Sequence, residues 1–169
     1  MAIEFHDFSV EVKEAMEDAA IAWLHEAIGE LEAQTKRNVP NRGNYFAEIK
    51  QSFTHVVDER EMEATVGSPM ERSLWNEYGT GEFSDSPKGG RQGYWVYVKG
   101  NASGGNSYNY KGGKQYTLEE AKQIVAMMRS DGLDAWYTKG QRPNRSMRKA
   151  YTKLKPRLIK SAQERFRNL

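Results

Sequence analysis

The residues whose types best suit chemistry lie in WNEYGTG, residues 75–81, where an acid stands among aromatic residues and two glycines flank a threonine. Glycine-rich turns can hold a phosphate through backbone N–H groups, and Glu77 could serve as an acid or a base. A nucleotide loop, however, requires G-x-x-x-x-G-K-[ST], or G-x-G-x-x-G between a strand and a helix. Neither WNEYGTG nor KGGRQG at 88–93 fits these patterns, so we predict no nucleotide and no other cofactor.

Acids and histidines elsewhere give no stronger indication of catalysis. Carboxylates stand in pairs near residues 58–63, but charged pairs at a hairpin turn are usually solvated. The three histidines, His6, His25 and His55, lack the spacing of metal ligands, and the chain has no cysteine. We expect His55 to face solvent or an adjacent strand, because no residue near it in the sequence could make it a catalytic base. G-x-S-x-G and H-E-x-x-H are absent, so we predict neither an enzyme nor a metal site.

The elements that position these residues begin with a long helix. Ser9 is suited to cap its start, Pro40 stops it, and apolar side chains recur between them in steps of three and four. Alternation at 52–57 and 62–67 predicts an antiparallel hairpin, and the chain before it begins with a loop at 41–44.

The second half of the chain predicts two strands and two helices. Residues 94–98 and 133–138 have the composition of strands, and between them Thr117-Leu-Glu-Glu opens a helix with a capping box. The last helix runs from Asn144 toward the end of the chain, and Pro156 should kink or interrupt it.

The segment MERSLWNEYGTG, residues 70–81, should form one or two helical turns that end at Gly79, where the corner at residues 79–81 begins. Glycine at both ends of this corner permits backbone angles that other residues resist. We expect Trp75 and Tyr78 to anchor the corner to the core. The residues assigned to this structural corner are Trp75, Glu77, Tyr78, Gly79, Thr80 and Gly81.

These elements predict an α+β fold in which an antiparallel sheet packs against long N- and C-terminal helices. We expect the hairpin to be extended by the two later strands, and a glycine-rich loop at 101–113 to interrupt the chain between them. With 169 residues the chain suits one domain, 1–169, that carries an insertion at 82–137. No apolar run is long enough for a membrane span and no signal peptide is apparent, so we expect a soluble, intracellular protein without membrane contact.

Charge is distributed unevenly although the net charge is only +2. Residues 1–38 hold nine acids and three bases, whereas residues 142–167 hold ten bases and one acid. One interpretation is a charged surface for nucleic acid or for a complementary subunit. The other is that an acidic helix and a basic helix lie side by side and solvate each other's flanks.

Several short fragments occur in a familiar order: Gly43 before Ser52, then ATVGS at 64–68, EYGT at 77–80 and GQRPNRSMRKA at 140–150. Together with the long first helix, this order resembles the tail-component family typified by the gene 10 product of a lambdoid phage. That family's pattern runs V-[DN]-T-G-x-L-x-x-S, V-G, Y-x-E-x-G-T and R-P-x-x-[FM]-[LM]-x-x-A. The chain departs from it at PNRGNY, where the family has D-T-G-x-L.

The resemblance implies a structural role in the neck of a tailed phage or prophage particle. Proteins of this family act in tail completion and join heads to tails, so it implies assembly in the host cytoplasm and a place in the neck or tail of the virion. Its implied partners are copies of itself in a ring, neighbouring neck and tail proteins and, without sequence preference, packaged DNA. The residues of the turn before the last helix are Gly140, Arg142, Pro143, Met147 and Ala150, and the candidate contacts with DNA or a subunit are Arg145, Arg148, Lys149, Lys153 and Lys160.

The competing class is a stand-alone binding module. The basic last helix favours nucleic acid, although none of the common docking motifs is present. The inserted strand, helix and strand are similar to part of a SPOR-type peptidoglycan-binding domain, which implies a glycan ligand instead.

Overall fold

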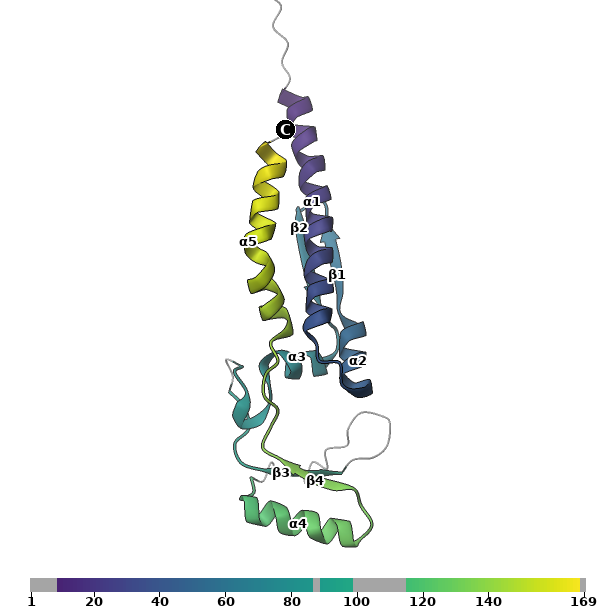
Figure 1. The fold of residues 1–169 in the computed structure, drawn as a ribbon, viewed down its shortest axis with the longest axis vertical. Helices are drawn as coiled ribbons and strands as arrows, with labels where there is room; N and C mark the ends of the chain where they lie inside the picture. Colours follow the sequence, from purple (N-terminus) through teal and green to yellow (C-terminus); the bar gives the residue numbers. More distant parts are fainter. Residues whose placement is uncertain (1–8, 87–88, 99–114, 168–169) are drawn as a thin grey trace, which may run out of the picture. The chain divides into compact units, whose positions relative to one another are not determined.

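The computed structural model describes residues 9–86, 89–98 and 115–167. Its contacts divide the chain into two compact units, which are Met1–Ser73 with Arg145–Leu169, and Leu74–Asn144. Figure 1 shows their helices and strands, coloured along the sequence. The glycine-rich loop predicted at 101–113 lies outside the described residues.

The first unit is built on two long helices, α1 (Ser9–Asn38) and α5 (Ser146–Arg167). They lie side by side and run in opposite directions (Figure 1). Asn38 at the end of α1 donates a side-chain hydrogen bond to the carbonyl of Ser146 at the start of α5 (3.0 Å). Ala150 and Leu154 of α5 are buried.

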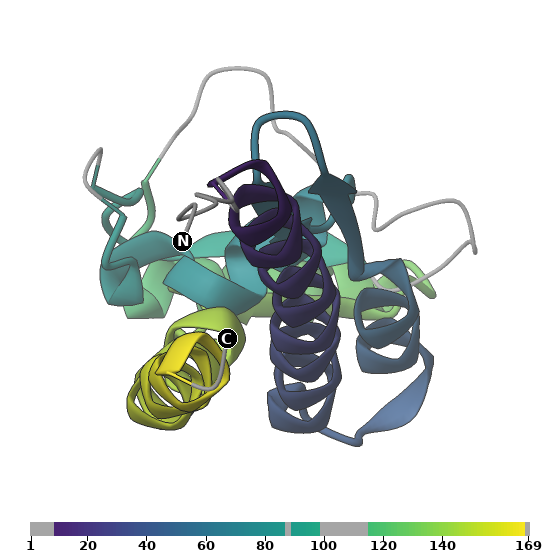
Figure 2. The same cartoon turned by 90° about the horizontal axis from the view of Figure 1, so that it is seen from above.

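A hairpin and a short helix complete the first unit. Strands β1 (Thr54–Asp58) and β2 (Glu63–Gly67) pair antiparallel, as predicted, and pack on α1. Figure 2 shows the hairpin and α5 on different sides of α1. Helix α2 (Gly43–Ser52) precedes the hairpin, and its Ile49 packs with Val39 and Phe53 in a fully buried cluster.

Two sequence predictions for this unit need correction. The loop predicted at 41–44 is shorter, because α2 already begins at Gly43, whose φ of 66° allows an abrupt start after Pro40. Pro156 does not interrupt α5, which continues through it to Arg167. Thr152 and Pro156 are both exposed, so water can satisfy the carbonyl that loses its partner four residues before the proline.

The second unit holds a small sheet with a helix on it. Strand β3 (Trp95–Val98) pairs antiparallel with β4 (Ala135–Thr138), and α4 (Leu118–Ser130) packs on both. The core consists of Val96, Ala121, Val125 and Ala135. The predicted capping box is present: Thr117 accepts a bond from the N–H of Glu120, whose carboxylate accepts the N–H of Thr117.

The α+β class with long terminal helices and an inserted strand-helix-strand segment is confirmed. The prediction of one extended sheet is wrong, because β1 and β2 form one sheet and β3 and β4 form another. An alternating pattern identifies strands without selecting their partners, so it did not distinguish these arrangements. The predicted insertion at 82–137 lies inside the second unit, which includes more residues at both ends, from Leu74 to Asn144. None of the described helices is both long and apolar enough to span a membrane.

Candidate functional site

The corner at residues 79–81 is closed by backbone hydrogen bonds to the segment before α5. Thr80 donates its N–H to the carbonyl of Gln141, and Gln141 donates its N–H to the hydroxyl of Thr80, each at 2.9 Å. Glu82 donates its N–H to the carbonyl of Lys139 (3.0 Å). Two fragments some sixty residues apart in sequence are thus held together in the second unit.

The close approach of these two segments requires glycine. Gly79 and Gly81 have φ angles of 74° and 59°, in the left-handed region that other residues resist. A Cβ on Gly81 would lie 2.1 Å from the carbonyl oxygen of Lys139, and one on Gly140 would lie 2.0 Å from that of Thr80. Neither backbone can retreat without breaking the hydrogen bonds that join them.

The side chains before the corner differ from the expectation. Trp75 was expected to anchor the corner, but it is 40% exposed, and the buried residues of this part of α3 (Glu71–Tyr78) are Asn76 and Glu77. The carbonyl of Asn76 accepts the N–H of Asn144 (2.7 Å), a third link between the same two segments. The short helix thus buries polar side chains beside the turn, while sequence reasoning assigned burial to the aromatic rings.

Cations surround Phe83 beside the corner. The guanidinium of Arg142 lies 5.0 Å from its ring centroid and the ammonium of Lys139 lies 5.3 Å from it. Lys139 also forms an ion pair with Glu82 (3.1 Å), and this hydrogen bond lowers the pKa of Glu82 and raises that of Lys139. Both groups therefore stay charged over a wider pH range, which suits a structural contact better than proton transfer.

The remaining residues assigned to the turn lie in the first unit. Met147 packs against the cluster of Val39, Ile49 and Phe53, and Ala150 is fully buried in α5. Arg145, the residue before α5, has a positive φ of 57°. The structure therefore divides the predicted turn between two units: Gly140, Arg142 and Pro143 belong to the second.

A second set of fragment residues meets in the first unit through serine hydroxyls. The Oγ atoms of Ser52 and Ser68 are 2.7 Å apart, and Ser68 is also 2.7 Å from Ser73. Ser52 donates to the carbonyl of Ile49 (2.8 Å), and the Ser68 hydroxyl accepts the N–H of Met70 (3.1 Å). Sequence reasoning identified Ser52 and Ser68 but gave no signal for Ser73. The cluster joins the end of α2 to the turn before α3.

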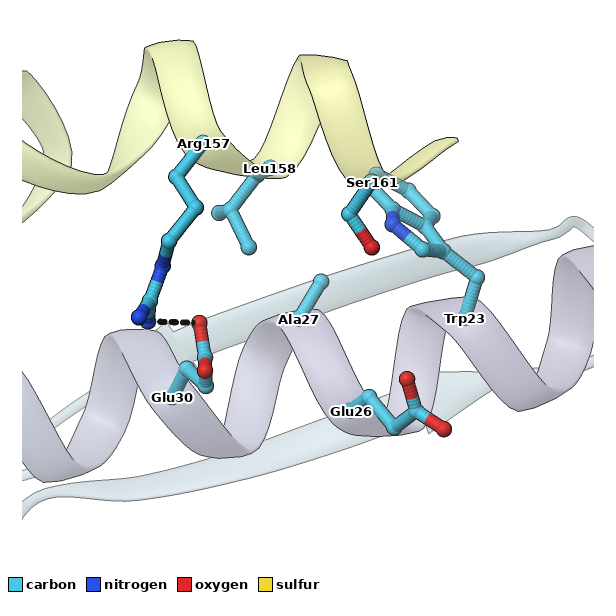
Figure 3. A pocket seen from close by; sticks show the side chains of 7 residues that line it. All are labelled: Trp23, Glu26, Ala27, Glu30, Arg157, Leu158 and Ser161. Carbon is cyan, nitrogen blue, oxygen red and sulfur yellow. Dashed lines mark hydrogen bonds and ion pairs between the residues drawn. The ribbon is translucent and has the colours of Figure 1, made fainter. Parts of the chain in front are cut away.

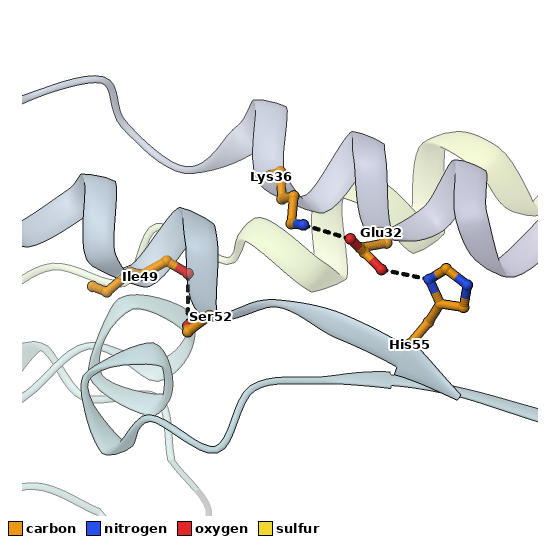
Figure 4. Close-up of polar contacts among 5 residues, drawn as sticks. All are labelled: Glu32, Lys36, Ile49, Ser52 and His55. Atoms are coloured by element: carbon orange, nitrogen blue, oxygen red, sulfur yellow. Dashed lines mark hydrogen bonds and ion pairs between the residues drawn. The ribbon is translucent and has the colours of Figure 1, made fainter. Parts of the chain in front are cut away.

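Two histidine–carboxylate pairs hold the hairpin to α1. His55 of β1 bonds Glu32, which also accepts a hydrogen bond from Lys36 (Figure 4). Nε2 of His25 in α1 lies 3.1 Å from a carboxylate oxygen of Glu59. The bond from Lys36, followed by that from His55, lowers the pKa of Glu32. His55 is exposed, as expected, but it also meets an acid 23 residues earlier, which no local sequence pattern indicates.

Ion pairs also join the two long helices. Arg157 binds Glu30 (Figure 3). Arg165 binds Glu26 through both carboxylate oxygens at 2.8 Å. Between these pairs lies a pocket of about 210 Å³, to which Trp23 contributes its indole ring. Of the two interpretations of the charge asymmetry, the structure shows acidic and basic helices side by side.

The five candidate DNA or subunit contacts are exposed, and they also make contacts within the chain. Lys153 donates to the side-chain carbonyl of Gln34 (3.3 Å), and Lys160 pairs with Glu164 (3.7 Å). Among the described residues, no cluster of three or more histidine or acidic side chains is close enough together to hold a metal ion.

No family model, no curated protein and no solved structure matches this chain. The contacts within the chain therefore indicate what the site can do. It contains hydroxyl clusters, glycine corners and ion pairs, and each of them fixes the position of one chain segment on another.

Proposed function

We propose that this chain is a structural component of a tailed-phage or prophage particle. It joins head to tail in the neck, and it acts by assembling with copies of itself and with neighbouring neck and tail proteins. The resemblance in the sequence suggests this role, and the contacts made by the same residues support it.

The observation that carries the proposal is that the fragments of the resemblance contact one another in pairs. Ser52 meets Ser68, and Thr80 meets Gln141. The first bond joins two hydroxyls and the second joins a hydroxyl to a backbone N–H, and both set the path of the chain. A site for covalent chemistry would instead align a nucleophile with a base. An assembly component needs its turns held in one conformation, and residues that fix the backbone at these turns meet that need.

The proposal is tested by deleting the gene from a genome that produces particles and inspecting the lysate by electron microscopy. The expected result is DNA-filled heads and separate tails, with joining restored by the wild-type gene supplied in trans. Supplying Gly81→Ala should restore fewer joined particles than supplying Gly132→Ala, whose added Cβ meets nothing within 4 Å. Normal joined particles after deletion would overturn the proposal.

DNA binding is a second candidate, favoured by the exposure of the basic residues of α5. Arg148, Lys149, Lys153 and Lys160 are all exposed and could neutralise phosphates. Titration with duplex DNA at several salt concentrations distinguishes the two roles. A steep loss of affinity with salt, absent when these four residues are changed to glutamine, favours DNA binding, whereas weak binding that the changes leave unaltered favours a structural role.

A further inference from the structure

A groove runs along the first turns of α1 in the first unit. Val12, Met16 and Ala20 of α1 form its floor, and Met62 of the turn after β1 and Phe166 of α5 form its sides. The groove has a volume of about 600 Å³, and Val12 is 55% exposed and Met16 48%. Because apolar side chains from three elements surround one open surface, the groove has the character of an interaction site.

Helix α1 projects at this end beyond the elements that pack on it. Figure 1 shows its start extending past the end of α5 and past the hairpin. From Val12 to Ala20 the floor of the groove is roughly 12 Å long, at about 1.5 Å per residue. Within the described residues of this unit, side chains of other elements border the groove only at its sides. The groove is therefore open to an elongated partner such as another helix.

The charged groups of the groove are balanced. Lys13 and Glu17 are the two charged residues that line it, and they lie 3.7 Å apart within the helix, with side chains 76% and 44% exposed. The helical spacing places Glu11, Glu14 and Asp18 on the opposite face of α1. A partner that carries charge of one sign would therefore meet one attractive and one repulsive group in the groove.

A second copy of α1 running in the opposite direction meets two attractive groups. Lys13 and Glu17 stand on the same side of the groove, and a two-fold axis across two helices brings the same side of each together. With the axis at the level of residue 15, Lys13 of each copy lies level with Glu17 of the other, because both are two residues from the axis. Met16 then lies at the level of residue 14, between Val12 and Met16 of the other copy, as a knob lies in a hole. One arrangement thus pairs both the charges and the apolar side chains.

We propose that the groove binds the start of α1 from a second copy of this chain, so that two copies form a two-fold dimer in which Lys13 faces Glu17 at two places. The contact is isologous, because the same surface serves on both copies. The first turns of each α1 lie along the groove of the other, whose sides are Met62 and Phe166. A two-fold contact closes on itself, so any larger assembly uses other surfaces. The dimer does not depend on the proposed role in a particle.

The association itself is tested by a charge placed in the groove. The wild type should sediment at micromolar concentration with twice the chain mass of 19.3 kDa. Met16→Asp puts two carboxylates beside the axis among apolar side chains and should weaken association at least tenfold. Ile159→Asp on α5 is the matched control, since Ile159 is also 48% exposed but does not line the groove, and it should associate like the wild type. Circular dichroism checks that each variant is folded.

The two-fold symmetry is tested by cross-linking, because the chain has no cysteine of its own. In Met16→Cys the new thiol lies beside the axis and meets its counterpart, so mild oxidation should give a disulfide-linked dimer on a non-reducing gel. Glu11→Cys, on the opposite face of the same helix, should stay monomeric on that gel after the same treatment.

The charge pairing is tested by mixing. Lys13→Glu and Glu17→Lys each bring like charges together across the axis, so each variant alone should dimerise more weakly than the wild type. In their mixture opposite charges face each other at both places, and the mixed dimer should be roughly fivefold tighter than either variant's own dimer.

A monomeric wild type, a Met16→Asp variant that dimerises normally, equal cross-linking at positions 16 and 11, or a mixture no tighter than its components would overturn the interface. None of these results bears on the role in the particle, which gene deletion tests. If the wild type is monomeric but deletion still separates heads from tails, the dimer is wrong and the role stands. If the dimer forms but deletion leaves joined particles, the dimer stands and the role is wrong.

Discussion

Replacing Gly81 by alanine should loosen the corner at residues 79–81. A left-handed backbone costs an alanine about 1–2 kcal/mol. The new Cβ would lie 2.1 Å from the carbonyl oxygen of Lys139, so the two segments must separate and the hydrogen bond from Glu82 to that oxygen is lost. Losing it adds about 0.5–1.5 kcal/mol. We expect Gly81→Ala to lower the free energy of unfolding by about 1.5–3.5 kcal/mol.

The matched control is Gly132→Ala at the end of α4. Gly132 also has a positive φ, 81°, but a Cβ there meets nothing within 4 Å. It should cost only the left-handed backbone strain, about 1–2 kcal/mol. The difference between the two variants therefore isolates the close approach of the segments.

Urea unfolding followed by tryptophan fluorescence gives the free energies, and hydrogen exchange reports the corner directly. The N–H groups of Thr80, Glu82 and Gln141 should exchange faster in Gly81→Ala and be unchanged in Gly132→Ala, because these three groups close the corner. Equal destabilisation by both variants, or unchanged exchange at all three amides, would refute the reasoning.

Three further predictions follow from the first unit. Lys36 and His55 hold the pKa of Glu32 in the folded protein below its usual value. The ionised Glu32 therefore contributes its full stability above the unfolded-state pKa, and this contribution is lost as the pH falls through the folded-state pKa. Glu32→Gln should flatten the acid side of a plot of unfolding free energy against pH. Leu154 is only 5% exposed, so Leu154→Ala should lower the free energy of unfolding, measured with urea, by about 2–4 kcal/mol. Arg157→Ala should lower it by less than about 1 kcal/mol, because the ion pair of Arg157 is largely exposed. Equal losses of stability in the two variants would contradict this prediction. Ser68→Ala removes a hydroxyl that bonds two serines and one backbone N–H. It should lower the stability measured by thermal melting by about 1–3 kcal/mol. The control Thr152→Ala, on the exposed face of α5, should leave the stability almost unchanged.

Sequence reasoning succeeded where the determining interactions are local. Two such features are the capping box at Thr117 and the apolar spacing of α4 and α1. Each involves residues within one helical turn of each other, so the pattern can be recognised in the sequence alone. Helix α2 was missed because only ten residues form it and its apolar side chains meet partners from elsewhere, including Met70 and Met147.

The contacts of the candidate sites were less predictable, because they join residues that lie far apart in the sequence. Gly79 and Gly81 were identified as a corner, but their partner segment, which begins at Lys139, lies far along the chain. His55 and Glu32 meet only because the hairpin packs on α1. Pairing between distant segments depends on tertiary packing, which residue spacing does not encode.

The uneven charge of the chain corresponds to the packing of its two long helices against each other. In the middle, Glu26 and Glu30 face Arg165 and Arg157, so acidic and basic flanks neutralise each other within one copy. Because the two helices are antiparallel, the start of α1 lies toward the end of α5, where Arg165 and Arg167 supply further bases. Exposed ion pairs add little stability, so the packing of α1 on α5 does not depend on these pairs alone.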